Sequence, residues 1–415
     1  MSMNSVWARA AGAWRTVVEQ VYVHPVEPYA VVSVRPDRRW ELRPACGICL
    51  ERAPLYDRGR RRRWRSLDNG LMRVFLEAEV PRVRCARHGV VMAAVPWARH
   101  AAGHTLAFDE TVAWFAVAAS KKLVAVLLRI NWHTVGAIVE RVMDDRDIED
   151  GDRLAGVRRI GIDEVSFRKG QQYLTIVVDH DSGRLLYVAE GRTKDAVRAF
   201  FDLLGARRSG EITHVSADGA GWIAAVLAEK VPQAKVCLDP FHVVKWATDA
   251  LDKVRRQVWN TARRAGMSEL AQGLKDARYA LWKNPEDLTE RQQAKLAMIQ
   301  DTNKPLYRAY LLKEQLRAVF KPGGPERIRL LDAWLAWAAR SRLTPFVELA
   351  RTLRARRTEI AHALAHKLTN ARIESTNQKI RLLIRRAYGF RSIDALTAMI
   401  RLCLAGYARP LPGRT

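Results

Sequence analysis

The sequence lacks the features of secreted and membrane-spanning proteins. Its 5 cysteines among 415 residues are few, odd in number and unevenly spaced, so a disulfide framework is not expected. No run of about 18 uncharged apolar residues occurs, which argues against a transmembrane helix. The first residues, MSMNSVWARAAGAW, contain neither the apolar core nor the cleavage site of a signal peptide. We therefore expect a cytoplasmic protein with no membrane partner.

Acidic residues are also scarce. The chain has 44 Asp and Glu against 70 Lys and Arg, which gives a formal net charge of +26. A charge of this size favours polyanionic partners and makes their binding sensitive to salt. Basic residues concentrate in residues 1–100 and 351–391, which suits a protein that holds nucleic acid in more than one place. The hydrophobic content of 48% and the length predict roughly two to four globular domains.

Three of the cysteines fall in a pattern typical of a metal site. Cys46 and Cys49 form one close pair, and Cys85 and His88 form a second pair further along the chain. Two such pairs are the usual way to present four ligands to a tetrahedral zinc ion, so we expect one structural Zn²⁺. The other two cysteines, Cys237 and Cys403, lie in apolar surroundings and are expected to be buried.

The residues around the zinc ligands predict mainly strands. We expect a short helix over 6–18, strand material over 29–42 and an alternating strand over 74–83. The run between the two ligand pairs is strongly basic and contains Trp64. This composition predicts phosphate contacts. The candidate DNA-binding residues here are Arg61, Arg62, Arg63 and Arg65.

Residues 104–143 have helical spacing and resemble a helix-turn-helix. A helix over 104–120 is followed by a second over 122–128 and a third over 132–143, which Asn131 is placed to cap. The third helix has an apolar stripe at Val135, Ile138, Val139 and Val142. The opposite face could enter a major groove. Its candidate DNA-binding residues are Trp132, His133, Thr134 and Arg141.

An acidic run over 144–152 is expected to be a linker, and beyond it the pattern changes to strands. Strands are predicted over 160–163, 173–179 and 185–190, a helix over 194–204, a strand over 212–217, a helix over 222–230 and a strand over 235–238. Three antiparallel strands followed by alternating helices and strands is the order of a ribonuclease H-like fold. In that order the first and fourth strands are neighbours, so Asp163 and Asp218 would lie side by side. Residues 240–360 are predicted to be helical throughout.

These acidic residues suit phosphoryl transfer. Metal-dependent cleavage of phosphodiesters uses two divalent ions about 3.5–4 Å apart, held by carboxylates. Asp163 and Asp218 supply two, and Glu374, on a basic helix, is the best third candidate, with Asn377 and Arg381 on the same helical face. Glu164, Asp179 and Asp239 remain alternatives. His242 and Asn377 are candidates for supporting contacts around the ligands.

Several segments together resemble the DDE transposases of the bacterial ISL-three insertion-sequence family. They include the Cys46/Cys49 and Cys85/His88 pairs, and they occur in the family's order over nearly the whole chain. The other matching segments are Trp132–Val135, Gly161–Val165, Val215–Gly219, Asp239–Val243, Leu311–Leu316, Asn370–Asn377 and Arg386–Phe390.

The resemblance implies a multidomain α/β protein with a catalytic triad of Asp163, Asp218 and Glu374 that binds Mg²⁺ or Mn²⁺. It implies cleavage at the ends of an insertion sequence, bound through its terminal inverted repeats, and strand transfer into target DNA. Lys379, Arg381, Arg385 and Arg386 are then candidates for phosphate contacts. Because two ends must be joined, a homodimer or larger assembly on double-stranded DNA at the nucleoid is expected.

The resulting organisation has five parts. We expect a zinc-binding DNA-binding domain over 1–100, the helix-turn-helix and linker over 101–152, the first part of a ribonuclease H-like core over 153–240, an all-helical insertion over 241–365 and the rest of the core over 366–415. Two other functions remain open. One is a DNA-binding regulator derived from an inactive transposase, and the other is a ribonuclease H-like endonuclease that cuts without joining.

Overall fold

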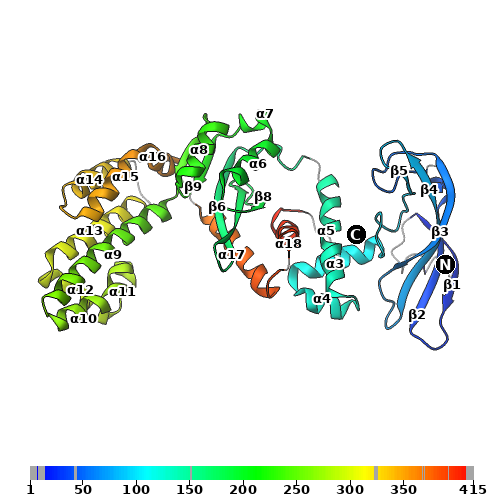
Figure 1. Cartoon of the computed structure of the whole chain (residues 1–415), viewed down its shortest axis with the longest axis horizontal. Coiled ribbons are helices and arrows are strands. Elements are labelled where there is room, and N and C mark those ends of the chain that lie inside the picture. Colours follow the sequence, from blue (N-terminus) through cyan, green and yellow to red (C-terminus); the bar gives the residue numbers. More distant parts are fainter. Residues whose placement is uncertain are drawn as a thin grey trace. The chain divides into compact units, whose positions relative to one another are not determined.

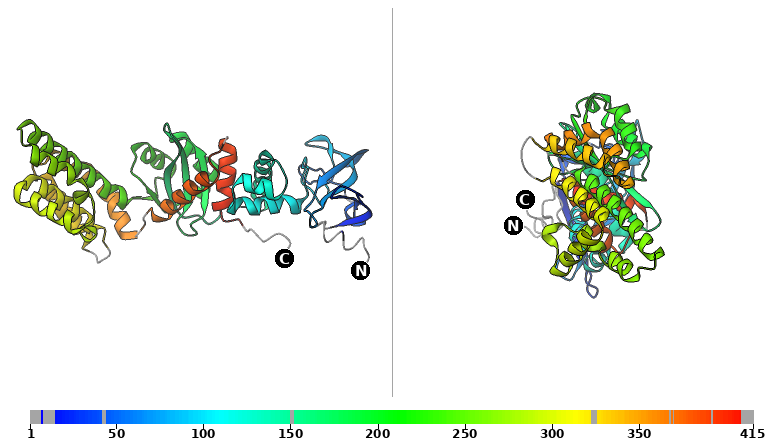
Figure 2. Two further views of the ribbon diagram at one scale, coloured as in Figure 1. Left: turned by 90° about the horizontal axis from the view of Figure 1, so that it is seen from below. Right: turned by 90° about the vertical axis from the view of Figure 1, so that its left-hand side faces the viewer.

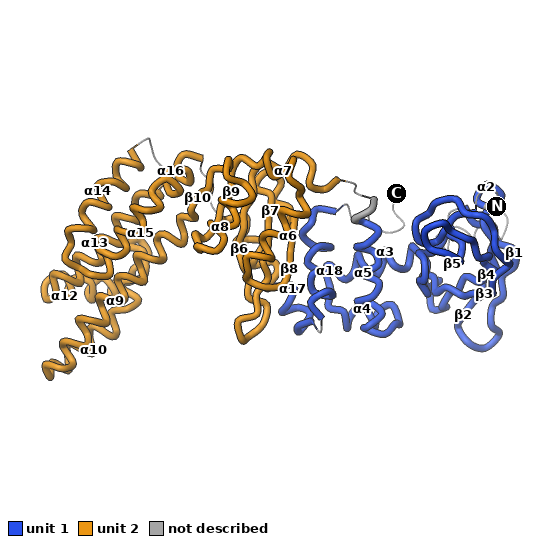
Figure 3. Tube along the Cα trace, turned by 45° about the horizontal axis from the view of Figure 1, so that its top comes forward, with its two compact units in different colours: residues 1–151, 382–415 blue, residues 152–381 orange. Residues whose placement is uncertain are grey.

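The computed structural model describes residues 15–41, 44–149, 152–321, 326–366, 370–390 and 392–407, together with positions 7 and 368. The chain divides into two compact units (Figure 3). Unit 1 comprises residues 1–151 and 382–415, and unit 2 comprises residues 152–381. The segment after residue 382, which we had grouped with the catalytic core, therefore falls in the same unit as the N-terminal residues.

Unit 1 begins with a five-stranded sheet. Its central path runs in the order β1-β2-β4-β3, and β5 pairs with the far end of β4. The predicted alternation over 74–83 becomes β4, whose even-numbered residues Val74, Leu76 and Val80 are buried. They pack with Trp64 and Trp97, whose rings meet edge to face at 5.6 Å. The strands are β1 (Thr16–Val23), β2 (Tyr29–Pro36), β3 (Leu55–Arg65), β4 (Arg73–Cys85) and β5 (Gly89–Met92).

Two predictions for the N-terminal residues need correction. The helix expected over 6–18 lies largely outside the described residues, and its last part, from Thr16, belongs to strand β1. The strand expected over 29–42 ends at Pro36, and a short helix, α2 (Arg38–Glu41), follows. Proline has no N–H to donate to a sheet and it fixes its own φ, so a strand commonly stops there.

Three helices of unit 1, α3 to α5, follow the predicted pattern, and a fourth, α18, was not predicted. They are α3 (Leu106–Ala118), α4 (Lys121–Leu127), α5 (Trp132–Glu149) and the C-terminal α18 (Ile393–Leu404), which packs against α3 and α5. The acidic run is not a linker over its first part, because α5 continues through it to Glu149. Asp145 there forms an ion pair with the buried Arg99, so one acidic residue of this run neutralises an interior cation.

Unit 2 contains the second sheet, with strand order β10-β9-β6-β7-β8. Strands β6, β7 and β8 are antiparallel neighbours, while β9 runs parallel to both β6 and β10. The predicted neighbours, β6 and β9, are therefore paired (Figure 1). The elements are β6 (Arg159–Arg168), β7 (Gln172–Asp179), β8 (Leu185–Glu190), α6 (Lys194–Leu204), α7 (Ala206–Ser209), β9 (His214–Ala217), α8 (Gly221–Lys230) and β10 (Lys235–Leu238).

Side-chain alternation along β6 assigns each face of this sheet a different role. Ile160 and Ile162 are buried with Phe200 of α6 and Val226 of α8 in one apolar core. Gly161 points the other way, toward helix α17 (Ala371–Arg386). A Cβ placed on Gly161 would lie 2.1 Å from the Cδ1 of Ile373 and 2.9 Å from the Nε2 of His180. The missing side chain therefore lets α17 lie directly against the sheet.

Between β10 and α17 the described chain is helical, as predicted, and the helices lie alongside one another (Figure 2). Their shared core includes Trp334 and Phe346, both essentially inaccessible to solvent. The elements are α9 (Pro240–Arg264), α10 (Ser268–Asp276), α11 (Arg278–Trp282), the 3₁₀ turn η1 (Pro285–Asp287), α12 (Glu290–Thr302), α13 (Lys304–Val319), α14 (Arg327–Ala339), α15 (Thr344–Ala355) and α16 (Arg357–His366).

Among the described helices, none is by itself long and apolar enough to cross a membrane. The pair formed by Lys121–Leu127 and Trp132–Arg146 meets that test by length and composition, but it is bent by 103°.

The packing at Gly161 yields a first prediction. Gly161→Ala should destabilise the protein by about 1–3 kcal/mol, because an added methyl group overpacks the contact with Ile373. Urea unfolding, followed by a probe of unit 2, measures the change. Gly221→Ala is the matched control, since nothing lies within 4 Å of a Cβ at that exposed helical position. Equal stability of the two variants would show that α17 does not depend on this close approach.

Candidate active site and DNA-binding surfaces

The two predicted aspartates lie on neighbouring strands: Asp163 is inside β6, which continues beyond the predicted end to Arg168, and Asp218 directly follows β9. Ile160 pairs with Val215, and Gly161 pairs with Ser216. Asp163 lies two residues after Gly161, and Asp218 lies two residues after Ser216. The pairing of the two strands therefore places both aspartates at the same distance along the strand direction. Their proximity is evident in the pKa of Asp163, which burial raises and the charge of Asp218 raises further.

Asp163 is held in place by two hydrogen bonds. Its Oδ1 accepts from the backbone N–H of Glu164 at 2.8 Å, and its Oδ2 accepts from the Nδ2 of Asn377 at 2.8 Å. Asn377 is 4% exposed, and its own Oδ1 is buried with no hydrogen-bond partner among the described residues. Asn377 was predicted as a supporting residue, and it does orient Asp163. An unpaired buried oxygen beside a carboxylate is suited to a cation or to a donor from a substrate.

Asp218 is fixed by the tight turn after β9. Its Oδ1 accepts from the backbone N–H of Ala220 at 2.8 Å, within the turn that leads to α8. Gly219 has a φ of +80°, and a Cβ there would lie 2.5 Å from Leu238. Only glycine adopts this conformation in this space without strain, which explains the Asp-Gly sequence.

Glu374 lies on α17 at the edge of a cavity of about 510 Å³. The cavity is also lined by Asp163, Asn377 and Arg381. The predicted helical face, Glu374 with Asn377 and Arg381, is therefore directed at one place, while Ile373 and Ile380 on the other face are fully buried. Asp218 does not line this cavity, although it lies close to Asp163 and Glu164.

Two further carboxylates that we had left as alternatives line the same cavity. Burial, then the charges of Asp218 and Asp163, raise the pKa of Glu164 to about 7, although its partner Arg192 opposes the change. Burial also raises the pKa of Asp239, and the charge of Glu374 adds to it. Neighbouring carboxylates repel one another when they are charged, so a cation bound among them is favoured because it removes this repulsion.

The carboxylates fit hard divalent ions by ligand type. They offer oxygen atoms only, which Mg²⁺ and Mn²⁺ prefer. They do not form a closed ligand cage: within the described residues, only one group of three or more ligands has its binding atoms mutually within 4.8 Å, and it is the cysteine cluster. An open carboxylate set suits a magnesium ion, which keeps waters or phosphate oxygens in its coordination shell.

His242 lies at the first turn of α9 beside these carboxylates. Its Nε2 is 3.9 Å from the Oδ2 of Asp239, and its positive charge when protonated opposes the rise in the pKa of Asp163 and of Asp239. Asp239 caps α9 and Pro240 follows at the first helical position, so the helix starts at the cavity wall. A helix N-terminus and a histidine both favour an anion there.

The zinc ligands predicted from the sequence lie together in unit 1. Cys46, Cys49, Cys85 and His88 have their binding atoms within 4.8 Å of one another, and the Sγ of Cys85 is 3.5 Å from the Nδ1 of His88. The backbone N–H groups of Arg87 and His88 lower the pKa of Cys85 to about 6, which favours the thiolate that binds metal. Four ligands of this kind, so arranged, fit a structural zinc ion.

The second and third helices of the predicted helix-turn-helix meet at 103°, within the range usual for that motif. Asn131 accepts from the backbone N–H of His133 at 2.9 Å, as expected for a cap. The predicted apolar stripe is buried, and Trp132 and His133 are exposed at the start of α5. Thr134 beside them is half-buried.

The comparisons with known proteins agree with this geometry. Residues 160–400 match a family described as transposase, of the DDE type and the ISL3 group. Residues 42–88 match the zinc finger of the IS204, IS1001, IS1096 and IS1165 transposases, and residues 93–143 match the helix-turn-helix domain of ISL3 transposases. The chain belongs to the ISL3 family of transposases.

Two kinds of curated relatives support this membership. A transposase for insertion sequence element IS1557, found in two strains of Mycobacterium tuberculosis, is 54% identical over 96% of this chain and 95% of its own length. A transposase for insertion sequence element IS1001 of Bordetella parapertussis is 28% identical over 69% of this chain and 70% of its own.

A buried polar network that reaches Asp239 was not predicted from the sequence. His180 Nε2 and Ser216 Oγ are 2.7 Å apart, and that Oγ donates to the Oδ1 of Asn370 at 2.6 Å. The backbone N–H of Asn370 in turn donates to Asp239 at 3.4 Å. All four residues are at most 6% exposed. The network joins β7, β9, β10 and the start of α17, so it positions the helix that carries Glu374. Three of its members lie in segments that carried the family resemblance, Val215–Gly219, Asp239–Val243 and Asn370–Asn377, but nothing in those segments predicted that they bond to one another.

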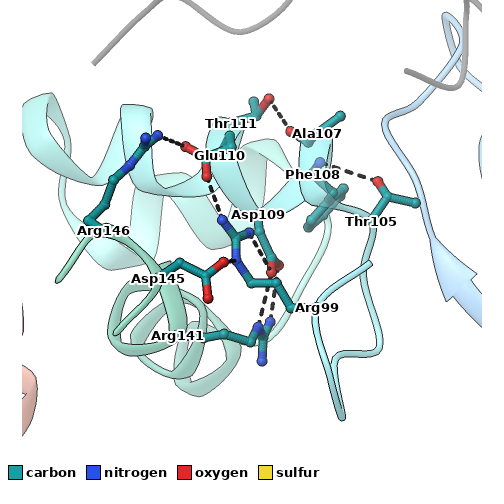
Figure 4. A network of polar contacts seen from close by, with 10 residues as sticks. All are labelled: Arg99, Thr105, Ala107, Phe108, Asp109, Glu110, Thr111, Arg141, Asp145 and Arg146. Atoms are coloured by element: carbon teal, nitrogen blue, oxygen red, sulfur yellow. Dashed lines mark hydrogen bonds and ion pairs between the residues drawn. The ribbon is translucent and has the colours of Figure 1, made fainter. Parts of the chain in front are cut away.

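Arg141 has a different role from the one predicted. Its guanidinium donates to both oxygens of Asp109, which is fully buried (Figure 4). Arg99 binds the same carboxylate and also Glu110 and Asp145. These contacts join α3 to α5 inside unit 1. We therefore leave Arg141 out of the proposed DNA surface.

The arginines of β3 divide between structure and surface. Arg65 is 8% exposed, pairs with Asp68 and lies over the rings of Phe75 and Phe108, so it supports the fold. Arg61 and Arg63 are exposed but share Glu77. Arg62 is exposed and lies beside a hollow of about 550 Å³ that Arg60 and Arg82 also line.

The predicted phosphate contacts of α17 fall in both units. Arg381 lines the active-site cavity and Lys379 is exposed, both in unit 2. Arg385 and Arg386 belong to unit 1, where Arg385 is exposed and Arg386 reaches the carbonyl oxygen of Ala116 at 3.5 Å.

The metal cluster yields a second prediction. Cys85→Ser should reduce the zinc content of the purified protein from one ion per chain to nearly none, because it removes one of four ligands at the point where the thiolate is favoured. Metal analysis after gel filtration measures this. Cys403→Ser is the control, since Cys403 is remote from the cluster in sequence and is not one of its ligands. Full zinc in the Cys85 variant would contradict the assigned ligands.

The buried histidine yields a third prediction. Burial, then Arg159 and Arg372, lower the pKa of His180 to about 4. Between about pH 6.5 and 4 the unfolded chain therefore takes up a proton at His180 that the folded chain does not, so stability is lost as the pH falls. His180→Gln should remove roughly 1–3 kcal/mol of this loss. Urea unfolding of both proteins at several pH values checks it, and parallel pH profiles would contradict it.

Proposed function

We propose that this transposase-family chain cleaves the ends of an insertion sequence and transfers them to target DNA, using Asp163, Asp218 and Glu374 as its catalytic carboxylates. The observation that carries the proposal is their convergence. The register of β6 and β9 brings the two aspartates level, and α17 directs Glu374 into the cavity that Asp163 lines.

The fold of unit 2 supports a ribonuclease H-like core. Three antiparallel strands, a helix, a parallel strand next to the first, a second helix and a fifth strand follow in the order expected for that fold. On this interpretation α9–α16 form a helical insertion, after which α17 returns the chain to the sheet. A carboxylate on this returning helix complements Asp163 within β6 and Asp218 directly after β9.

The carboxylates and their neighbours have separate tasks in the proposed reaction. Asp163, Asp218 and Glu374 would hold two Mg²⁺ or Mn²⁺ ions, with Glu164 or Asp239 as a further ligand. When bound, such ions activate a nucleophile and stabilise charge on the phosphoryl oxygens. Asn377 keeps Asp163 oriented. Arg381 and His242, which both line the cavity, would hold the phosphodiester through hydrogen bonds and charge.

DNA recognition is assigned to unit 1. The start of α5, with Trp132, His133 and Thr134, is available for a major groove, since its opposite face is buried. Arg61, Arg62 and Arg63 offer positive charge on β3, and Arg385 offers it on the part of α17 that belongs to unit 1. Lys379 is a separate candidate for phosphate contacts in unit 2. These contacts would bind the terminal inverted repeats, with phosphate contacts positioning and base contacts specifying. Pairing of two ends implies a homodimer or a larger assembly on DNA.

Two alternatives make different predictions. A DNA-binding regulator derived from an inactive transposase would bind the ends and never cut them. A ribonuclease H-like endonuclease would cut but not join. The presence of all three carboxylates, two of which line one cavity while the third lies close to Asp163, disfavours the first, and family membership disfavours the second.

The fourth prediction tests the proposed reaction. With labelled element-end DNA and Mn²⁺ or Mg²⁺, wild type should both cut and join. Asp163→Asn, Asp218→Asn and Glu374→Gln should each lose at least about a hundredfold of both activities, because each removes a charge that holds the metal. End binding, measured by fluorescence anisotropy, should be unchanged.

The matched control is Glu348→Gln, which removes an exposed carboxylate from α15. It should cut and join as wild type does. Retained activity in a triad variant would move the metal role to Glu164 or Asp239. Binding without any cutting by wild type would favour the regulator, and cutting without joining would favour the endonuclease.

A further inference from the structure

A second basic hollow lies in the helical segment of unit 2. It encloses about 780 Å³ between α9, α10, α11 and α12, and it shares no lining residue with the active-site cavity. Its lining carries six cations and one carboxylate, Asp276. The cations are Arg255, Arg256, Lys275, Arg278, Arg291 and Lys295.

The positive charge of this hollow is largely uncompensated. Arg255 and Arg256 share a single carboxylate, Asp252, with N–O distances of 2.8 and 3.1 Å. Lys275, Arg278 and Arg291 are exposed, and no carboxylate among the described residues forms an ion pair with them. Cations crowded into a concave surface repel one another, so an anion that enters relieves the repulsion and is held there.

Aromatic rings lie among these cations. Tyr279 is 61% exposed, and the guanidinium of Arg278 lies 6.0 Å from its ring centre. Its neighbour Trp282 is covered by the guanidinium of Arg278 at 3.9 Å from the ring centre. Trp259 lines the hollow as well. The hollow therefore offers a flat, apolar face next to several phosphate-binding groups.

These features favour a nucleic acid strand over other anions. Free phosphate or an acidic peptide would use the cations but would leave the face of Tyr279 uncovered. The bases of a duplex are stacked on one another, so a duplex that passes the hollow offers its phosphates but no base face. An unpaired strand supplies both, because its bases stack on exposed aromatic rings while its phosphates meet the cations. The concave shape also suits an inserted nucleotide better than it suits the rod-like DNA duplex.

We infer that this hollow binds an unpaired stretch of DNA, with phosphates on Lys275, Arg278 and Arg291 and a base stacked on Tyr279. The identity of the strand as DNA rests on the proposed function. The hollow itself does not depend on the catalytic triad. Such a site would hold a displaced or frayed strand at a DNA end away from the carboxylates.

The fifth prediction locates this strand by photocrosslinking. Full-length protein is irradiated with oligodeoxythymidylate that carries one 5-iododeoxyuridine, in the presence of excess duplex to occupy the other basic surfaces. Crosslinked peptides are then identified by mass spectrometry. The adduct is expected on Tyr279 or Trp259. Tyr279→Leu and Arg278→Gln should each reduce binding of the strand at this site about tenfold, since base stacking and the adjacent charge are lost.

Controls separate the hollow from charge and from catalysis. Arg351→Gln removes an exposed arginine of α15 outside the hollow and should leave the adduct unchanged. Because Tyr279 and Arg278 are both exposed, their variants should unfold at the wild-type temperature. Arg278→Lys keeps the charge and should restore most of the binding that Arg278→Gln loses.

Three results would overturn the inference: adducts that map mainly to unit 1, no effect of Tyr279→Leu, or equally effective competition by duplex DNA. Asp163→Asn distinguishes this inference from the proposed reaction. That variant should still form the adduct in the hollow although it no longer cuts DNA ends. Cutting by wild type without an adduct would remove the inference and leave the reaction intact.

Discussion

The active site depends on the close approach of α17 to β6 at Gly161. Any side chain there would occupy the space of Ile373, and would push the helix off the sheet. One residue further along α17 is Glu374, and two residues further along β6 is Asp163. A single packing contact between the helix and the sheet therefore sets how near two of the proposed metal-binding carboxylates come. Displacement of a ligand by an ångström is enough to impair such a site.

The same contact explains why the polar groups beneath it must be satisfied. Once α17 lies on the sheet, His180, Ser216 and Asn370 are cut off from water, and a buried polar group without a partner costs about 1–3 kcal/mol. Here they bond to one another and end at Asp239, and only the Nδ2 of Asn370 is left without a partner among the described residues. The low pKa of His180 follows from the same burial. The network thus keeps a neutral histidine next to a site whose carboxylates are arranged for cations.

The sequence predicted what depends on local pattern and missed what depends on tertiary contact. The strands and helices of unit 2 could be located because apolar periodicity and the Asp-Gly turn are local signals. The zinc ligands could be chosen because their spacing restricts the chemistry. The sequence pattern predicted that Arg141 lies on an exposed helical face. In the structure it donates a hydrogen bond to Asp109, which lies 32 residues earlier in the chain. The contacts of a long side chain depend on residues distant in the sequence, and the apolar periodicity of a helix does not predict which residues these are.

The two basic surfaces of unit 2 differ in how many carboxylates lie beside their cations. Around the proposed active site, arginine and histidine lie next to carboxylates. The electrostatic potential there can therefore turn from negative to positive when cations bind. In the hollow of the helical segment the cations have almost no acidic partners, and the field stays positive. The first arrangement suits a phosphate that must react and then leave. The second suits a strand that must only be held. A chain that breaks and rejoins DNA needs both, and the charge pattern keeps them apart.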